Sequence, residues 1–332
     1  MAVIKNAKQV ELYDLYKGYT PKKRMRYTAL FKAMGNEYMS NRSTLSLKDM
    51  FDNWEYAGIG KAGDMLKVLS NNGVNVLEIT PPQVGSQVSF SPEELEMINS
   101  SQAQEAYGYI NLIKEIEAKK VKKIASSVVN TTELMAQSIF LTGVYGDFDF
   151  GIPAATALTL KNADDLATQI IDQIEKFEVE NGYQGRVFMG SKGINALMNQ
   201  ARSTSNSKAN NTSITLADKF NDAERGSGFT FMLGAYNVEI EKLPLARKED
   251  GTFIDTSEMM IITAMENLGV GYAGVKVSNP NNIPDILKTD LYVDLGTVTD
   301  KRNPDVFIFG KGFPLPVIAN EKLHRRFTLT IS

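Results

Sequence analysis

The glycine-rich segment Gly58–Gly63 has the GxGxxG spacing of a dinucleotide-binding loop. In such a loop the glycines let the backbone approach a pyrophosphate, and an acidic residue about 20 positions later binds the ribose. Glu78 stands at that distance from Gly58. The loop should also follow an apolar strand directly, whereas the preceding residues, FDNWEYA, are polar. An NAD-dependent oxidoreductase is therefore one alternative, and the preferred interpretation of Gly58, Gly60 and Gly63 is a flexible hinge.

The other reactive side chains do not assemble into a catalytic set. Asp147 and Asp149 alternate with phenylalanines, but no glutamate follows at the spacing of a calcium loop. His324 is the only histidine, and the chain has no serine elbow to which it could belong. The absence of cysteine excludes disulfides, zinc–thiolate sites and cysteine nucleophiles. We therefore expect no cofactor, no metal and no enzymatic activity.

The composition is that of an ordinary globular protein, with 43% hydrophobic and 23% charged residues. A length of 332 residues suggests about two domains. The net charge of −3 argues against a basic nucleic-acid-binding protein, although basic residues cluster at Lys22–Arg26 and Lys119–Lys123. The longest apolar run, Met259–Met265, is too short to cross a bilayer, and no membrane association is expected.

Residues 1–45 predict an N-terminal arm. Its apolar side chains follow the i, i+3, i+4, i+7 pattern of a helix face and are Tyr27, Leu30, Phe31 and Met34. A short helix takes most of its stability from tertiary packing. One interpretation of this segment is a pair of core helices joined by a solvated turn, and the other is an extended arm that docks on a neighbouring subunit or contacts a polyanion.

Residues 71–92 predict an extended hairpin of strand, loop and strand, with Pro81, Pro82 and Gly85 in the loop. Its apolar side chains are Val74, Val76, Val88 and Phe90. An isolated two-stranded hairpin is only marginally stable in water. We therefore expect a neighbouring copy of the chain to cover it.

Ser91 and Pro92 open a helical pattern that continues, with interruptions, to about Ile139. Such a length suits a spine better than a helix inside a compact domain. A second helix should begin after an Asn162 cap, and strand 186–189 should lead into helix 191–202, which indicates an α/β layer. The polar stretch 203–213 is expected to be a mobile loop that contains Ser203, Asn206, Lys208 and Asn211.

This order of parts resembles the major capsid proteins of tailed bacteriophages, and more narrowly the lambda-type major capsid protein E family. The segments that carry the resemblance are 136–143, 185–193, 292–299, 303–309, 314–319 and 327–331. The resemblance implies the Hong Kong 97-like capsid fold, an α+β fold. The parts it implies are an arm at 1–45, an extended loop region at 46–100, a peripheral domain with the spine at 101–162 and 266–300, and an axial domain at 163–265 and 301–332.

The resemblance also implies a structural function. The chain would form pentamers and hexamers of an icosahedral or prolate shell around double-stranded DNA, which it would contact non-specifically. Its partners would be other copies of itself, a separate scaffolding protein, a portal and decoration proteins. It would reside in the virion after assembly in the host cytoplasm. The alternatives are an encapsulin-like compartment, a tail or baseplate protein, and the oxidoreductase described above.

Overall fold

The structure is a computed structural model that describes residues 7–18, 26–46, 50, 78–102, 107–161, 165–204, 214–217, 230–233, 236–278, 284–299 and 304–332. The chain divides into two compact units. Unit 1 comprises Met1–Gly18, Asn36–Val128 and Gly271–Leu315. Unit 2 comprises Tyr19–Gly35, Val129–Val270 and Pro316–Ser332. Each unit is therefore built from segments that lie far apart in the sequence.

Six α-helices and two short 3₁₀ helices lie in the part of the chain that the structure describes. They are α1 (Ala7–Lys17), α2 (Arg26–Lys32), α4 (Pro92–Gln102), α5 (Tyr107–Thr142), α6 (Leu166–Asn181), α7 (Ser191–Thr204), η1 (Met265–Asn267) and η2 (Glu321–Leu323). None of the described helices is long and apolar enough to cross a membrane.

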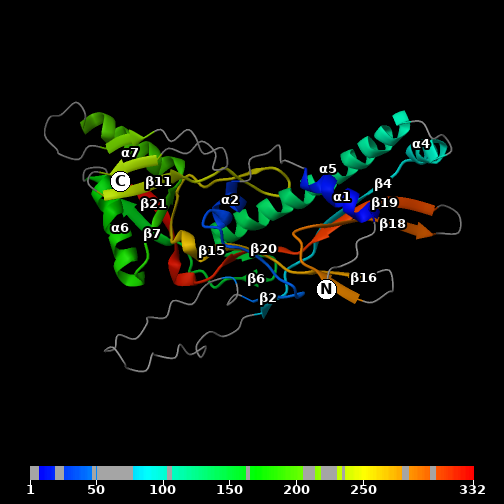
Figure 1. Ribbon diagram of the computed structural model, residues 1–332. Helices are drawn as coiled ribbons and strands as arrows, with labels where there is room; N and C mark the ends of the chain where they lie inside the picture. The colour runs from blue at the N-terminus through cyan, green and yellow to red at the C-terminus, as the bar shows by residue number, and fades with distance from the viewer. Residues whose placement is uncertain are drawn as a thin grey trace, which may run out of the picture. The chain divides into compact units, whose positions relative to one another are not determined.

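The spine helix predicted from the sequence is confirmed. Helix α5 has 36 residues, which corresponds to roughly 54 Å, and Figure 1 shows it as one uninterrupted helix. Ser91 begins the preceding helix α4 as a capping box, because its hydroxyl accepts a bond from the Glu94 N–H and the Glu94 carboxylate accepts one from the Ser91 N–H. The apolar stripe of α5 buries Val121 and Ile124 in unit 1.

Unit 1 contains an antiparallel sheet of order β18-β19-β4. Its strands are β18 (Tyr292–Thr299), β19 (Pro304–Gly312) and β4 (Val84–Ser89). A side chain on Gly310 would come within 2.5 Å of Ile124 on α5, so glycine lets β19 approach the helix closely. Strands β18 and β19 pair along their whole length, and both strands belong to unit 1.

The hairpin expected at 71–92 does not form among the residues described there. Strand β3 (Glu78–Ile79) pairs with β2 (Leu45–Ser46), whereas β4 pairs with β19. The segment with Pro81 and Pro82 therefore carries the chain from one sheet to another. Local pattern indicated two strands correctly, but a partner more than two hundred positions away leaves no local signal.

Unit 2 contains a mixed seven-stranded sheet of order β7-β21-β14-β8-β11-β10-β9. Its strands are β7 (Thr156–Leu160), β21 (His324–Ile331), β14 (Met259–Thr263), β8 (Arg186–Met189), β11 (Tyr236–Lys242), β10 (Thr230–Leu233) and β9 (Ile214–Ala217). The pairs β21–β7 and β11–β8 are parallel. Helices α6 and α7 contribute Ile170, Ile174, Phe177, Ile194 and Leu197 to the core against this sheet.

The ends of α6 and α7 differ slightly from expectation. Asp165, not Asn162, caps α6, because its carboxylate accepts the Ala167 N–H. Gly182 ends the helix in the left-handed region with φ of +72°. Helix α7 ends at Thr204, so Ser203 belongs to its last turn and not to the loop expected from 203.

The remaining strands form small sheets. These have the orders β1-β15-β20, β2-β3, β5-β6, β12-β13 and β16-β17. Their bounds are β1 (Glu37–Met39), β15 (Leu268–Tyr272), β20 (Pro314–Ile318), β5 (Val144–Tyr145), β6 (Phe148–Asp149), β12 (Ala246–Arg247), β13 (Phe253–Ile254), β16 (Val275–Ser278) and β17 (Pro284–Leu287).

Candidate functional site

Several residues singled out in the sequence lie outside the described residues. They are Gly58, Gly60, Gly63, Val74, Val76, Asn206, Lys208 and Asn211. Glu78 lies on the exposed strand β3, and its carboxylate is 3.6 Å from the Arg42 guanidinium. Within the described ranges, no three His, Cys, Asp or Glu side chains gather closely enough to hold a metal ion. The carboxylate of Asp149 accepts the Gly151 N–H in a turn.

His324 is a structural residue in unit 2. Its Nε2 lies 2.9 Å from the Phe140 carbonyl oxygen near the end of α5, and its Nδ1 lies 3.1 Å from the Thr263 hydroxyl. Because a carbonyl can only accept, Nε2 carries the proton. Complete burial lowers the pKa of His324 to about 4, so the ring is neutral at physiological pH.

The apolar stripe of the arm packs inside its own chain, which corrects the interpretation that it docks on a neighbour. Tyr27, Leu30 and Phe31 are buried, and the rings of Tyr27 and Phe31 both contact Phe140 of α5. Only Met34 of this stripe is exposed, with 50% of its surface accessible. The core-helix interpretation therefore holds for α2, and Met34 alone stays a candidate for intersubunit contact.

Glu133 on α5 fixes the beginning of α2. Its two carboxylate oxygens accept the backbone N–H groups of Arg26, Tyr27 and Thr28 at 2.8–2.9 Å, together with the Thr28 hydroxyl at 2.7 Å. The first N–H groups of a helix have no partner within the helix, and the helix dipole favours a negative charge beside them. One side chain thus satisfies most of this helix start.

The candidates Val88 and Phe90 also pack within the chain. Val88 pairs with Ile308 on β19 and is partly buried on the same sheet face as that residue. Phe90 is buried, and the Lys120 ammonium lies 4.7 Å from its ring centroid. Lys120 also donates to the Ser89 carbonyl and the Glu94 carboxylate, so it is buried while the other lysines of the 119–123 cluster are exposed.

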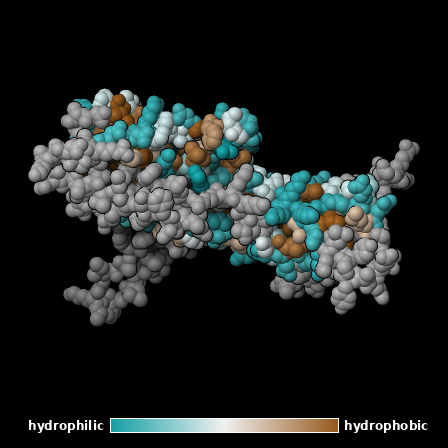
Figure 2. All heavy atoms as spheres, turned by 90° about the horizontal axis from the view of Figure 1, so that it is seen from above, coloured by the Kyte–Doolittle hydropathy of each residue, from teal (hydrophilic) through white to brown (hydrophobic). Residues whose placement is uncertain are grey.

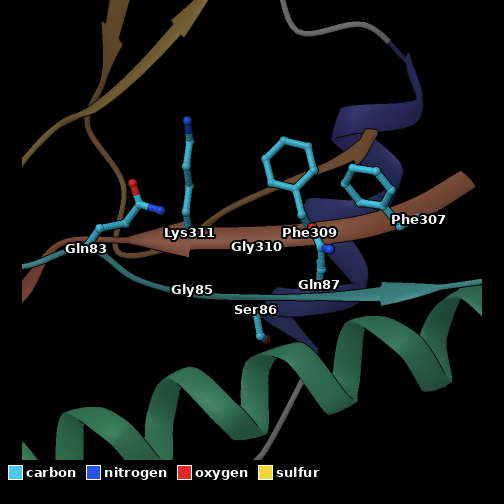
Figure 3. A pocket seen from close by; sticks show the side chains of 8 residues that line it. All are labelled: Gln83, Gly85, Ser86, Gln87, Phe307, Phe309, Gly310 and Lys311. Carbon is cyan, nitrogen blue, oxygen red and sulfur yellow. The ribbon is translucent and has the colours of Figure 1, made fainter. Parts of the chain in front are cut away.

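The outer face of the sheet β18-β19-β4 carries a shallow hollow of about 500 Å³. Figure 3 shows Phe307, Phe309 and Lys311 projecting from one face of β19, while Ser86 points from β4 toward α5. The ring centroids of Phe307 and Phe309 are 6.1 Å apart. Gln83, Gly85 and Gln87 line the opposite side of the hollow, along β4 and the residue before it.

The chemistry of this hollow suits contact with another molecule. Its lining supplies two aromatic rings, two amides and one ammonium, and contains neither a carboxylate nor a histidine. Half-buried aromatic rings beside hydrogen-bonding groups are typical of interface positions. Alternate residues of β19 share a face, but sequence reasoning did not single out this set. The sequence FIFGK contains the alternation that could have indicated it.

No protein-family model matches the chain, and no curated protein sequence matches it. Solved structures do resemble it. A protein described as a prophage capsid protein from E. coli CFT073 has a TM-score of 0.56 at 12% identity, covering 99% of this chain and 100% of that chain. A phage-related protein from Bordetella bronchiseptica RB50 has a TM-score of 0.48 at 11% identity, covering 99% and 98%. A virus-like particle from Pyrococcus furiosus has a TM-score of 0.40 at 10% identity, covering 96% of this chain and 97% of that chain.

The first of these similarities shows the fold. The chain has the α+β fold of a phage capsid protein, so the fold class expected from the order of its parts is confirmed. The narrower resemblance to the lambda-type family stays a prediction.

Proposed function

We propose that this chain, which has a phage capsid fold, is the structural subunit of a bacteriophage shell. The observation that carries the proposal is the coverage of the fold similarity, which extends over 99% of this chain and 100% of the prophage protein described as a capsid protein. A match of that extent includes both units, so the similarity is not confined to one of them.

The described surface supports a binding function. The hollow on β18-β19-β4 offers aromatic and amide groups but no acid–base pair. Exposed large apolar side chains also occur on both units, among them Met34, Met97, Val179, Leu245, Phe253 and Leu295. On the face in Figure 2, hydrophobic areas are small and lie within mostly hydrophilic surroundings. Several small contacts with neighbouring copies fit this distribution better than one large interface.

The finer features belong to the same proposal. Copies of the chain would form the pentamers and hexamers of a closed shell around double-stranded DNA, with a scaffolding protein, a portal and decoration proteins as further partners. The shell would assemble in the host cytoplasm and become part of the virion. Gly58, Gly60 and Gly63 would let one chain adapt to different curvatures, and the stretch 205–213, which follows the end of α7 at Thr204, would be a mobile axial loop. Exposed Lys119, Lys122 and Lys123 on α5 offer a cationic face for non-specific DNA contact.

Negative-stain microscopy of the purified protein tests this proposal. The chain should be expressed alone and together with the scaffolding protein encoded beside it, if there is one. We expect closed particles of uniform diameter in at least one of the two preparations. Open tubes or single rings would favour a tail or baseplate protein. A protein that stays monomeric in both preparations, at concentrations of about 1 mg/ml or higher, would contradict the proposal.

A further inference from the structure

The hairpin β12–β13 in unit 2 presents apolar side chains to solvent. Leu245 is 59% exposed and Phe253 is 58% exposed. Arg247 pairs with Phe253 across the hairpin, and its guanidinium lies 4.5 Å from the Phe253 ring centroid. Alternate residues of a strand share a face, so Leu245, Arg247 and Phe253 form one patch, which we call the hairpin patch.

The hairpin patch is held rigidly. Gln137 on α5 accepts the Arg247 N–H at 2.8 Å and donates to the Arg247 carbonyl at 2.7 Å. The Tyr27 hydroxyl donates to the Pro244 carbonyl at 2.8 Å. These bonds fix the strand before any partner arrives, which reduces the conformational entropy lost on binding. Two exposed apolar side chains on such a fixed element are typical of a protein–protein interface.

Helix α6 of the same unit presents a second unusual surface. Asp172, Glu175, Lys176 and Val179 follow i, i+3, i+4, i+7 spacing and therefore share one face. Val179 is 86% exposed, and with Glu180 these residues line a shallow hollow of about 310 Å³. Glu180 is paired with Arg325, which leaves the carboxylates of Asp172 and Glu175 against the Lys176 ammonium, so the face is weakly acidic around an apolar centre. We call it the α6 face.

We propose that the hairpin patch of one copy docks on the α6 face of the next copy. The charges are complementary, since Arg247 would meet the carboxylates Asp172 and Glu175, while Leu245 and Phe253 would cover Val179. The charges of the turn beside the patch nearly cancel, because the Lys248 ammonium offsets one of the two carboxylates of Glu249 and Asp250. Both surfaces are exposed on the single chain within one compact unit, so they can meet only between copies.

A contact between two different patches is heterologous and continues from copy to copy, which closes into a ring when the rotation allows it. The inference rests on the proposed shell function and names the contact that would join subunits within a ring. It involves unit 2 alone.

Cross-linking tests the contact directly, because the chain has no cysteine of its own. The double variant Val179→Cys/Phe253→Cys should be assembled, treated with a short bismaleimide and separated on a denaturing gel. We expect a ladder of covalent multimers that extends beyond the dimer, and only monomer for each single variant. The matched control pair Phe253→Cys/Leu295→Cys, with Leu295 exposed on unit 1, should give no ladder. Assembled particles that yield only monomer from the Val179/Phe253 pair would overturn this inference and leave the shell function standing.

A charge exchange gives an independent readout. Arg247→Glu and Glu175→Arg should each lower the assembled fraction about tenfold, because like charges would face each other at the contact. The two changes together should restore assembly to within about twofold of the unmodified chain, and the control Lys248→Glu should leave it unchanged. Failure of the double variant to regain assembly would overturn the pairing. An unmodified chain that never assembles would overturn both the pairing and the proposed function.

Discussion

At the scale of single residues, Glu133 determines where the arm helix begins. It lies 107 positions after Arg26, yet its carboxylate accepts three backbone N–H groups at the start of α2. Bonds from neutral donors to a charged acceptor are stronger than bonds between neutral groups. Nothing local in the sequence indicates this cap, because the acceptor comes from another helix.

Glu133→Ala should therefore destabilise the subunit. Four donors on α2 would lose their acceptor, and we expect the free energy of unfolding in urea to fall by about 2–3 kcal/mol. Glu133→Gln should recover part of that loss, since its amide oxygen still accepts. The control is Glu115→Ala, an exposed position on the same helix, with an expected change below about 0.5 kcal/mol. Equal stability of the Glu133 and Glu115 variants would show that the cap contributes nothing.

His324 makes the stability of unit 2 depend on pH. Burial lowers its pKa to about 4 in the folded chain, against about 6.5 in the unfolded chain. Between these values the unfolded state binds more protons, so folding stability is fully present above pH 6.5 and is lost as the pH falls toward 4. The shift corresponds to about 3 kcal/mol.

The variant His324→Gln removes this titration while keeping a side chain that can donate and accept. Because the chain has no other histidine, the difference in unfolding free energy between the unmodified chain and the variant isolates this group. We expect that difference to decrease by about 3 kcal/mol from pH 7 to pH 4. A difference that stays constant over this range would mean that the ring is not buried as a neutral group.

At the scale of elements, α2 belongs to the core of unit 2 rather than to a free arm. Phe31 is fully buried and contacts Phe140, so Phe31→Ala should cost about 3–5 kcal/mol of unfolding free energy. Met34, in the turn that follows α2, is half exposed, and Met34→Ala should change stability by less than about 1 kcal/mol. If Met34 contacts a neighbouring copy, the Met34→Ala substitution should lower the assembled fraction instead. Thermal unfolding of the free subunit separates the two, and a stable Phe31 variant would contradict the core position.

Sequence patterns predicted the elements well and their partners poorly. The 3.6-residue period predicted α5, α6 and α7 because each buries one continuous stripe. Strand pairing depends on long-range contacts with no local trace. Thus β4 was expected in a hairpin with the preceding strand, whereas it pairs with β19.

The candidate contact residues show the same limit. Sequence reasoning singled out Tyr27, Phe31 and Phe90 because their own segments offered too few apolar residues to bury them. Packing against Phe140 and Lys120 of α5 buries them within the chain. The residues that stay exposed, such as Val179 and Phe253, carry no local signal. An exposed valine on a helix and a buried one differ only in the face they occupy once the core is known.

At the scale of the whole molecule, the proposed shell requires many copies of one chain to meet through small surfaces. Both units would have to contact neighbours, and the same chain would have to form rings of five and of six.

Cryo-electron microscopy of the assembled particle tests this central claim most directly. We expect a closed shell in which this chain alone builds both fivefold and sixfold rings, with α5 visible as a continuous rod in every subunit. A particle built from another protein, with this chain absent from the rings, would contradict it. So would an assembly of this chain that has only one type of ring and never closes.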